Sequence, residues 1–299
     1  MNNATKNKII DRIFNYLGVF CTLIGLVVLA IFLINIVVEG IARIDFDFLT
    51  SLPSRKAEKA GILTAWVGTL WIISFTFLIA VPLGICAGIY LEEYGGKSKL
   101  ASILEVNISN LAGVPSVIYG LLGLEIFVRV FSMGSSVIAG SFTLALLILP
   151  IIIVATREAL KAIPSTIRAA SYALGASKWQ TIWNQVLPAS FGGILTGVIL
   201  AISRAVGETA PLIVVGALAY VPFTPKGPMD EFTVLPIQIF NWVSRPQHAF
   251  SVNSAAAIII LLFPFFKFSL IYIPFKTPLS LYSSTKIFKL SDTLENFFS

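Results

Sequence analysis

Two residues of opposite charge, Arg204 and Glu208, lie four positions apart inside the apolar stretch GILTGVILAISRAVGETAPLIVVGALAY (193–220). At this spacing, two side chains on one face of an α-helix can form an ion pair. Arginine suits an oxyanion because its planar guanidinium can donate two parallel hydrogen bonds and stays charged at any working pH. A carboxylate beside it would hold the guanidinium in place and offset its charge. The chemistry that this pair could do is therefore reversible binding of an anion.

The elements that must position this pair are those of a membrane protein. The chain is 57% hydrophobic and only 12% charged, whereas soluble domains have about 25% charged residues. Its two cysteines lie in apolar runs and form no disulfide or metal-site pattern. A charge inside the bilayer is costly, so Arg204 should face a cavity or a partner. The alternative is that Arg204 and Glu208 only neutralise each other and hold helices together.

Six stretches are apolar and long enough, at roughly 20 residues, to cross the bilayer as helices. They are 17–38, 65–90, 103–130, 136–156, 189–219 and 252–275. The sequence thus predicts an all-α membrane protein with six transmembrane helices, forming a single polytopic domain over residues 1–299. The segments that this topology places on the side of the termini hold more Lys and Arg than those on the opposite side. The positive-inside rule therefore puts both termini in the cytoplasm.

Prolines interrupt four of the predicted spans, at Pro82, Pro115, Pro150 and Pro211. A proline inside a helix removes a backbone hydrogen bond that another group must replace. In the third span, NISNLAGVPS (107–116) predicts a break that faces protein or water, with a simple packing kink as the alternative. Broken helices at membrane depth are typical of transport proteins.

Small residues accompany the charged pair on the fifth span. On one continuous helix through Pro211, Gly193 and Gly197 share a face with Arg204 and Glu208. Glycines four residues apart let another helix approach closely. We therefore expect a second helix to pack against this glycine pair.

Aromatic residues mark the external segment PMDEFTVLPIQIFNWVSRPQHAF (228–250). Phe240 and Trp242 are placed like anchors in the membrane interface. We interpret this segment as lying on the membrane, with an ordinary loop that re-enters the bilayer as the alternative.

The longest internal loop, 157–188, is predicted to be structured. Ser165 can cap a short helix over 167–174, which Gly175 ends. A second amphipathic segment, 179–186, leads through Leu-Pro into the fifth span. Short helices joined by a glycine turn form a knob that suits docking into a groove on a soluble partner.

The knob sequence RAASYALGASKWQTIWNQVLP (168–188) resembles the coupling loop of ABC importer permeases, which has Glu-Ala-Ala, three residues, Gly, and Leu-Pro at its end. Ala169 stands where the family has Glu. The coupling residues that the resemblance implies are Arg168, Ala170, Ser171, Gly175, Ser177, Lys178, Leu187 and Pro188. The resemblance also implies the type I, MetI-like permease fold, with a core over 65–275.

Three further segments narrow the resemblance. NLAGVPSVIYGLLGL (110–124), ALLILPIIIVATREALKAIP (145–164) and RAVGETAPL (204–212) are similar to PstA-type permeases of phosphate-specific transport systems. This similarity implies a permease subunit of an ATP-driven phosphate importer that forms half of the translocation pathway. Its substrate pathway would include Arg204, Glu208 and Thr209. Permeases for sulfate or molybdate are similar in this segment but do not typically have the GETAP sequence.

The resemblance implies partners as well. They are a PstC-like permease in a heterodimer, two copies of a PstB-like ATPase and an external PstS-like phosphate-binding protein, at the bacterial plasma membrane. The sequence has no P-loop motif G-x-x-x-x-G-K-[ST]. We therefore expect a chain that is not an enzyme and holds no cofactor, with ATP and Mg²⁺ bound by the ATPase. The alternatives are a permease for another oxyanion, an anion channel or secondary transporter, and a regulatory protein that reports phosphate.

Overall fold

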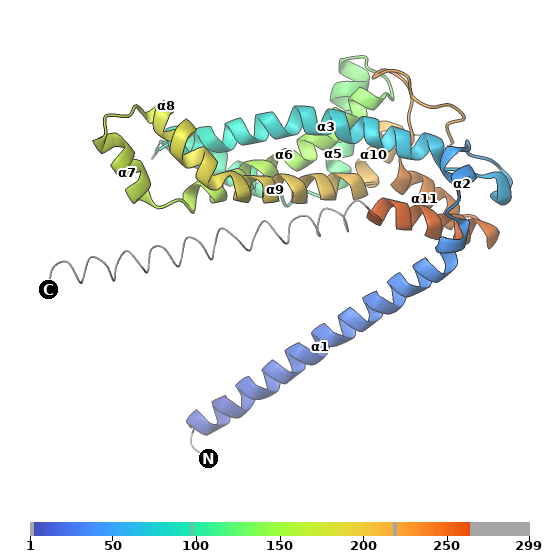
Figure 1. The fold of residues 1–299 in the computed structure, drawn as a ribbon, viewed down its shortest axis with the longest axis horizontal. Coiled ribbons are helices and arrows are strands. Elements are labelled where there is room, and N and C mark those ends of the chain that lie inside the picture. Colours follow the sequence, from blue (N-terminus) through green and yellow to red (C-terminus); the bar gives the residue numbers. More distant parts are fainter. Residues whose placement is uncertain (1–2, 97, 218–219, 264–299) are drawn as a thin grey trace. The chain divides into compact units, whose positions relative to one another are not determined.

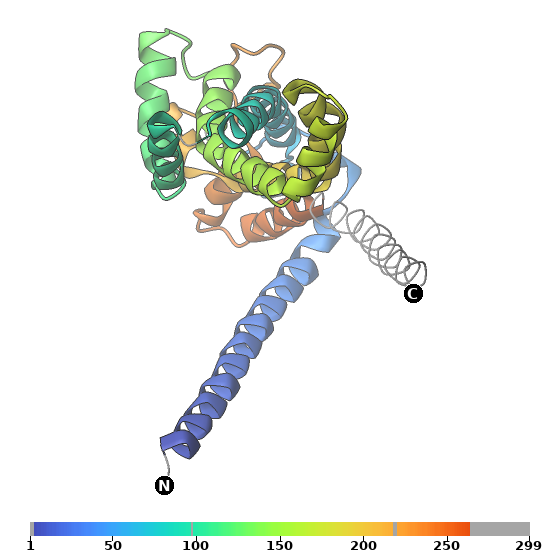
Figure 2. The ribbon, with the colours of Figure 1, turned by 90° about the vertical axis from the view of Figure 1, so that its left-hand side faces the viewer.

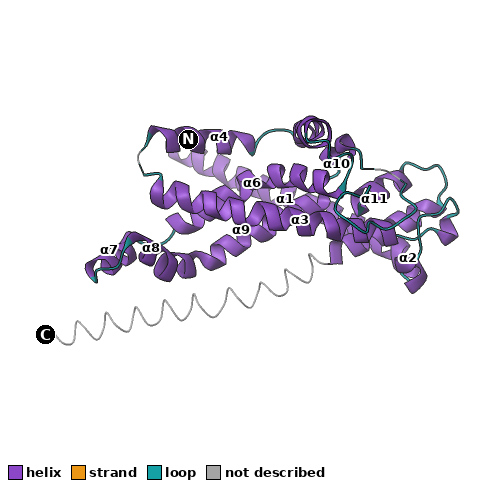
Figure 3. Cartoon of the chain, turned by 90° about the horizontal axis from the view of Figure 1, so that it is seen from above, coloured by secondary structure: helices purple, strands orange, loops and turns teal. Residues whose placement is uncertain are grey.

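The structure is a computed structural model that describes residues 3–96, 98–217 and 220–263. Within these residues every regular element is helical, and Figure 3 shows helices joined by loops. The α-helices are α1 (Asn3–Gly40), α2 (Phe46–Thr50), α3 (Leu63–Ile89), α4 (Lys99–Leu111), α5 (Ser116–Gly123), α6 (Val137–Lys161), α7 (Ser165–Ala173), α8 (Lys178–Thr181), α9 (Leu187–Gly207), α10 (Ala210–Val215) and α11 (Leu235–Val243). Short helical turns of other pitch are η1 (Ile41–Arg43), η2 (Ala57–Lys59), η3 (Tyr90–Tyr94), η4 (Leu124–Val130) and η5 (Ile182–Val186). A last described helix covers Ala249–Phe263.

Each predicted span overlaps a described helix, although the helix of the fifth span begins at Lys178 and ends at Gly207. Four are long and apolar enough to cross a membrane, namely Asp11–Arg43, Leu63–Tyr94, Val137–Lys161 and Lys178–Gly207. A fifth crossing results if the bent pair Ala101–Leu111 and Ser116–Val130 is one span. Ala249–Phe263 covers the start of the predicted sixth span, whose remainder (264–275) lies outside the described residues. The all-α architecture is confirmed for the described residues, and the count of six stays a prediction.

The chain divides into two compact units. Among the described residues, one unit contains those up to Ile44 together with 252–263, and within it Arg43 Nε donates a hydrogen bond to Asn253 Oδ1 at 3.2 Å. The larger unit, Asp45–Ser251, holds the charged pair and the knob that the sequence singles out. A single polytopic membrane domain stays a prediction.

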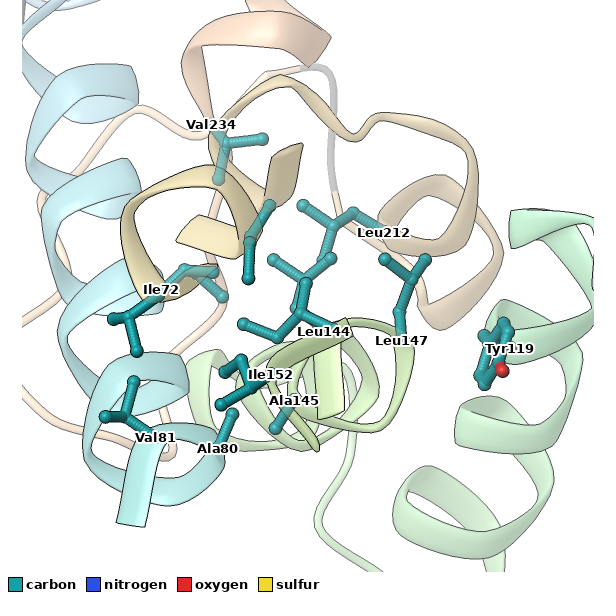
Figure 4. Close-up of a cluster of buried hydrophobic side chains, with 14 of the residues drawn as sticks. Ile72, Ala80, Val81, Tyr119, Leu144, Ala145, Leu147, Ile152, Leu212 and Val234 are labelled. Carbon is teal, nitrogen blue, oxygen red and sulfur yellow. The ribbon is translucent and has the colours of Figure 1, made fainter. Parts of the chain in front are cut away.

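The core of the larger unit is a bundle of α3, α6 and α9, which Figure 2 shows end on. Its buried cluster includes Ile72 of α3, Leu144 and Ile152 of α6, and Leu212 of α10 (Figure 4). The most apolar part of α6 is 67% buried, against 28% for the span with α3 and 33% for the span with α9. The unit therefore encloses α6, while α3 and α9 keep exposed faces.

The four prolines act in two ways. The helix continues through Pro82 in α3 and through Pro150 in α6. Pro115 directly precedes α5, and Pro211 lies in the first turn of α10. Only the latter two therefore coincide with helix ends.

The predicted break in the third span is confirmed. Between α4 and α5 the chain bends by 105° at Ala112–Pro115. The Tyr119 hydroxyl donates a hydrogen bond to the Leu111 carbonyl oxygen at 2.8 Å, and so satisfies one acceptor at the end of α4. What the break faces in the assembled protein stays a prediction.

The interpretation of Trp242 as an interfacial anchor is wrong. Its side chain is 1% exposed, and its ring centroid lies 6.0 Å from that of Phe48 and 6.4 Å from that of Phe250. Packing between α2, α11 and the following helix buries the indole, and these contacts are distant in sequence. Phe240, on the same helix, is 60% exposed, and its role as an anchor stays a prediction.

The helix that approaches the glycine pair is α6. A Cβ added to Gly193 would lie 2.8 Å from Ala159 Cβ, and one added to Gly197 would overlap Ala155 Cβ. The expected close helix contact is thus confirmed. This contact fixes α9, which carries Arg204, against the most buried helix of the unit.

We expect Gly197→Ala to destabilise the protein, because a methyl group at this point pushes α9 away from α6. Overpacking of this kind costs about 1–3 kcal/mol. Gly192→Ala is the matched control, since a Cβ there meets nothing within 4 Å and the change in helix propensity is the same. Thermal unfolding of the purified protein in detergent should show a lower midpoint for Gly197→Ala only. Equal midpoints for the two variants would contradict the packing.

Candidate functional site

Arg204 lies in the last turn of α9, and Glu208 follows the last residue of that helix, Gly207. Glu208 has an extended backbone with φ −76° and ψ 127°. The predicted continuation of the helix to residue 219 is therefore wrong. A proline ring clashes with the carbonyl group four residues before it, which for Pro211 is that of Gly207.

The ion pair forms across this break. Arg204 Nε donates to Glu208 Oε1 at 3.2 Å. The Arg204 side chain is 43% exposed, whereas that of Glu208 is 17% exposed. The carboxylate is thus largely enclosed by the chain, and the guanidinium stays accessible to a ligand or to a second protein chain.

The short helix α10 fixes the break against the third span. A Cβ on Gly120 of α5 would lie 2.7 Å from Pro211 Cα, so the two backbones are in direct contact. Leu212 and Val215 are buried, and Thr209 is half-buried just before the helix. Arg204, Glu208 and Thr209 thus adjoin a rigidly packed turn of the chain.

The predicted knob lies at the other end of this unit. Figure 1 shows α7 and α8 at one end and α2 and α11 at the opposite end. After α7, Gly175 has φ +81°, in the left-handed region that favours glycine. From α8 the chain continues through η5 into α9 without a gap, so Leu187 and Pro188 lie within one helical run, Lys178–Gly207. The expected helix and glycine turn are confirmed.

The caps of the knob differ from the prediction. Ser165 is the first residue of α7, and no side-chain hydrogen bond caps that helix. Ser177 caps α8 instead, with its Oγ accepting from Gln180 N and its N–H donating to Gln180 Oε1 at 2.8 Å. This Ser-x-x-Gln spacing is a capping box that the sequence displays. The Ser171 and Thr181 hydroxyls are 2.9 Å apart and tie α7 to α8.

Arg168 binds to its own chain rather than projecting outward. Its guanidinium donates to Glu93 Oε1 from Nη2 at 2.7 Å and from Nε at 3.1 Å. It also donates to the carbonyl oxygens of Leu160 at 2.9 Å and Ile163 at 2.8 Å. The Arg168 side chain is 19% exposed and that of Glu93 is 7% exposed. Arg168 is therefore a positioning residue for the knob.

Lys178 completes this attachment. Its Nζ donates to the Glu93 carbonyl oxygen and lies 4.7 Å from the centre of the Tyr94 ring. The other predicted loop residues are Ala170, Gly175, Ser177 and Pro188, which are exposed, and Ser171 and Leu187, which are half-buried. The two basic side chains of the knob are thus held at η3, directly after α3.

The sequence reasoning missed two carboxylates that position the knob, Glu92 and Glu93. The available signal was their adjacency in YLEEYGG, at the end of a span expected on the same side as the knob. Arg157 Nε donates to Glu92 Oε2 at 3.1 Å, and Arg157 also pairs with Glu105. These pairs join segments that the predicted topology places on one side of the membrane.

We expect Glu93→Gln to release the knob, because Arg168 then loses its counter-charge. A loss of about 1.4 kcal/mol in local stability would raise tryptic cleavage after Arg168 about tenfold. Glu92→Gln is the matched control, since its partner Arg157 keeps Glu105. Cleavage sites are mapped by mass spectrometry after limited digestion. Equal cleavage after Arg168 in both variants would argue against the positioning role.

Comparison with known proteins identifies the family. Residues 80–273 match the family model described as "Binding-protein-dependent transport system inner membrane component". The chain belongs to this family. It is also 36% identical to the phosphate transport system permease protein PstA of Haemophilus influenzae, over 81% of this chain and 83% of the relative. The corresponding PstA of Yersinia pestis is 40% identical over 79% of each chain.

Further matches agree with this membership. The probable ABC transporter permease protein YqgI of Bacillus subtilis is 30% identical over 86% of this chain and 87% of its own. A solved structure of the MetNI methionine ABC transporter in an inward-facing conformation has a TM-score of 0.53, at 18% identity, over 71% of this chain and 94% of that chain. The relatives place the chain among PstA-type ABC permeases, and the solved structure confirms the MetI-like permease fold.

Two statements follow from membership in this permease family. The chain is a multi-pass membrane protein of the inner membrane component type. It is the permease subunit of an ABC importer and not an enzyme, so ATP hydrolysis and substrate capture belong to an ATPase and a binding protein on other chains.

Proposed function

We propose that the chain is the permease subunit of an ATP-driven importer for inorganic phosphate and forms half of its translocation pathway. Relatives named as phosphate transport system permeases support the choice of substrate. The observation that carries the mechanism is the exposed guanidinium of Arg204, set at a helix break beside a mostly enclosed carboxylate. An arginine that is exposed on the isolated chain, within an apolar helix, needs a partner in the membrane.

Arg204 would bind phosphate as it passes. Glu208 accepts a hydrogen bond from Nε, and the two terminal nitrogen atoms can form a bidentate pair with an oxyanion. The carboxylate offsets the positive charge, so the anion is held without being trapped. Thr209, next in the chain, adds a hydroxyl beside this route.

The partners that we assign complete the pathway and supply the energy. A PstC-like permease pairs with this chain and covers the exposed side of Arg204. Two PstB-like ATPase subunits bind ATP and Mg²⁺, and a PstS-like protein delivers phosphate from outside. Both termini of this chain are cytoplasmic, and the chain itself holds no cofactor.

The helical run Lys178–Gly207 supports a direct mechanical link between motor and pathway. It joins the knob to Arg204 without a gap, and 30 residues span about 45 Å at 1.5 Å per residue. Closure of the ATPase dimer would move the knob as a rigid body and swing this helix, opening the Arg204 region outward. ATP hydrolysis would return the pathway to the inward-open state.

Transport in proteoliposomes tests this function. The four proteins are reconstituted together, and uptake of labelled phosphate is followed with and without ATP. We expect that uptake needs both ATP and the binding protein. Excess unlabelled phosphate should reduce the uptake of labelled phosphate, whereas sulfate and molybdate should not. Flux without ATP would indicate a channel or carrier, sulfate transport would indicate another oxyanion permease, and an assembled complex without flux would indicate a regulatory protein.

A further inference from the structure

Two helix breaks of the larger unit lie close together. One is the corner of the third span, Ala112–Pro115, where the chain bends by 105° between α4 and α5. The other follows α9, where Glu208 leaves the helix. A Cβ added to Gly120 of α5 would lie 2.7 Å from Pro211 Cα and 2.9 Å from Val214 Cβ of α10. The two broken spans are therefore in direct contact a short way along the chain from each break.

Tyr119 closes the corner from the side of this contact. Its hydroxyl donates to the Leu111 carbonyl oxygen at 2.8 Å, and Val114 N donates to the same oxygen at 3.1 Å. Tyr119 is 7% exposed and lies at the edge of the buried cluster (Figure 4). The hydroxyl thus ties the end of α4 to α5 across the bend.

A buried tyrosine hydroxyl needs a partner, and a purely structural role would already satisfy that need. Two observations point further. Tyr119 directly precedes Gly120, whose close contact with Pro211 leaves no room for a side chain. The guanidinium of Arg204 is also near enough for its charge to act on the Tyr119 hydroxyl. The group that closes the corner therefore lies close to the residue to which we assign anion binding.

We infer that Tyr119 is a positioning residue for the anion site: its hydroxyl locks the corner to α5, so that the corner and the Arg204–Glu208 turn move as one body. The inference rests on the proposed function, because it takes Arg204 as the anion ligand and the swing of α9 as the motion. Close-packed segments transmit a displacement to each other. Without the hydroxyl, α5 still follows α10, but the end of α4 is no longer tied to α5 through this side chain.

The test compares Tyr119→Phe, which removes only the hydroxyl, with Tyr16→Phe as the matched control, since Tyr16 lies on α1 and is 68% exposed. Uptake of labelled phosphate is measured in proteoliposomes, with assembly checked by co-purification of all subunits. We expect uptake to fall about three- to tenfold for Tyr119→Phe, the factor that corresponds to one neutral hydrogen bond. Tyr16→Phe should keep normal uptake.

A second readout follows the corner itself. Val114 is half-buried in the corner, and Val114→Cys is placed in a background with Cys21→Ala and Cys86→Ala. Its rate of labelling by a thiol reagent is measured in the ATP-trapped state and without nucleotide. With Tyr119 present, the two rates should differ by about threefold or more, because the nucleotide shifts the population of the two states. In Tyr119→Phe this difference should disappear.

The outcomes separate the inference from the proposed function. Normal uptake by Tyr119→Phe overturns the inference, and so does one labelling rate of Val114→Cys in both nucleotide states of the unmodified complex. A difference between the states that persists in Tyr119→Phe, with uptake reduced only in proportion to the assembled complex, would make Tyr119 a residue that stabilises the fold alone. All three results leave phosphate transport in place. Absence of ATP-driven phosphate uptake by the unmodified complex contradicts the proposed function itself.

Discussion

Arg204→Gln should lower ATP-driven phosphate uptake roughly 30-fold or more while the complex still assembles. The glutamine keeps the size of the side chain but removes the charge and the planar fork that bind an oxyanion. Loss of one partner of a desolvated charge pair costs about 2–5 kcal/mol of binding free energy. A loss of about 2 kcal/mol already corresponds to a roughly 30-fold effect. Uptake is measured in proteoliposomes, with assembly checked by co-purification of all subunits.

The chain provides its own control for this experiment. Arg129 and Glu125 form a pair at the same four-residue spacing, with Nη1 and Oε2 2.8 Å apart and side chains 65% and 61% exposed. Solvent-exposed pairs of this kind contribute little. Arg129→Gln should therefore leave uptake unchanged. Normal uptake by Arg204→Gln, or equal losses in the two variants, would remove Arg204 from the pathway.

Gly175→Val should uncouple ATP hydrolysis from transport. At φ +81° a residue other than glycine is strained by roughly 1–2 kcal/mol, and a β-branched side chain by more. No atom lies within 4 Å of a Cβ at this position, so the effect acts through the backbone turn and not through a clash. The turn between α7 and α8 would reorient the knob against the ATPase.

The measured quantity is the number of phosphate ions imported per ATP hydrolysed. We expect this ratio to fall about tenfold or more for Gly175→Val, in line with a misplacement of about 1 Å costing a large factor in a positioned site. Gly175→Asn is the control, because asparagine tolerates the left-handed region, and it should keep a ratio close to that of the unmodified protein. A normal ratio for Gly175→Val would show that this turn does not transmit the motion.

Local patterns in the sequence were sufficient for much of the fold. Long apolar runs predicted the spans, and NISNLAGVPS predicted the break beside which Tyr119 bonds. The Gly193–Gly197 spacing predicted close packing with another helix, which the structure identifies as α6. Each of these depends on residues within a few turns of one another. Features of this kind can be predicted from the hydrophobicity and the helical periodicity of the sequence.

Features that depend on distant residues escaped prediction. Trp242 is buried by Phe48 and Phe250, and the Arg168–Glu93 pair joins positions 75 residues apart. The predicted continuation of the fifth helix beyond Gly207 was wrong for a local reason. The ring of Pro211 conflicts sterically with the carbonyl group four residues before it. The Ser177 capping box is likewise a local pattern, a serine followed three residues later by Gln180.

One helical run, Lys178–Gly207, joins the knob to the charged pair. Glu93 fixes the basic residues of the knob at the end of α3, and the glycine pair fixes α9 on α6. Movement of the knob would therefore be transmitted along packed helices rather than through a flexible loop. In the proposed mechanism, the break after Gly207 is the point where this movement would reach the anion.

Access to Thr209 tests most directly whether Arg204 lines a gated route for phosphate. Thr209→Cys is placed in a background with Cys21→Ala and Cys86→Ala, because both native cysteines are exposed. Labelling by a negatively charged thiol reagent, applied from outside, is timed in the assembled complex. If the route is gated, labelling is faster in the ATP-trapped state than without nucleotide, and phosphate slows it while sulfate does not. One labelling rate in every state, unaffected by phosphate, would contradict the pathway.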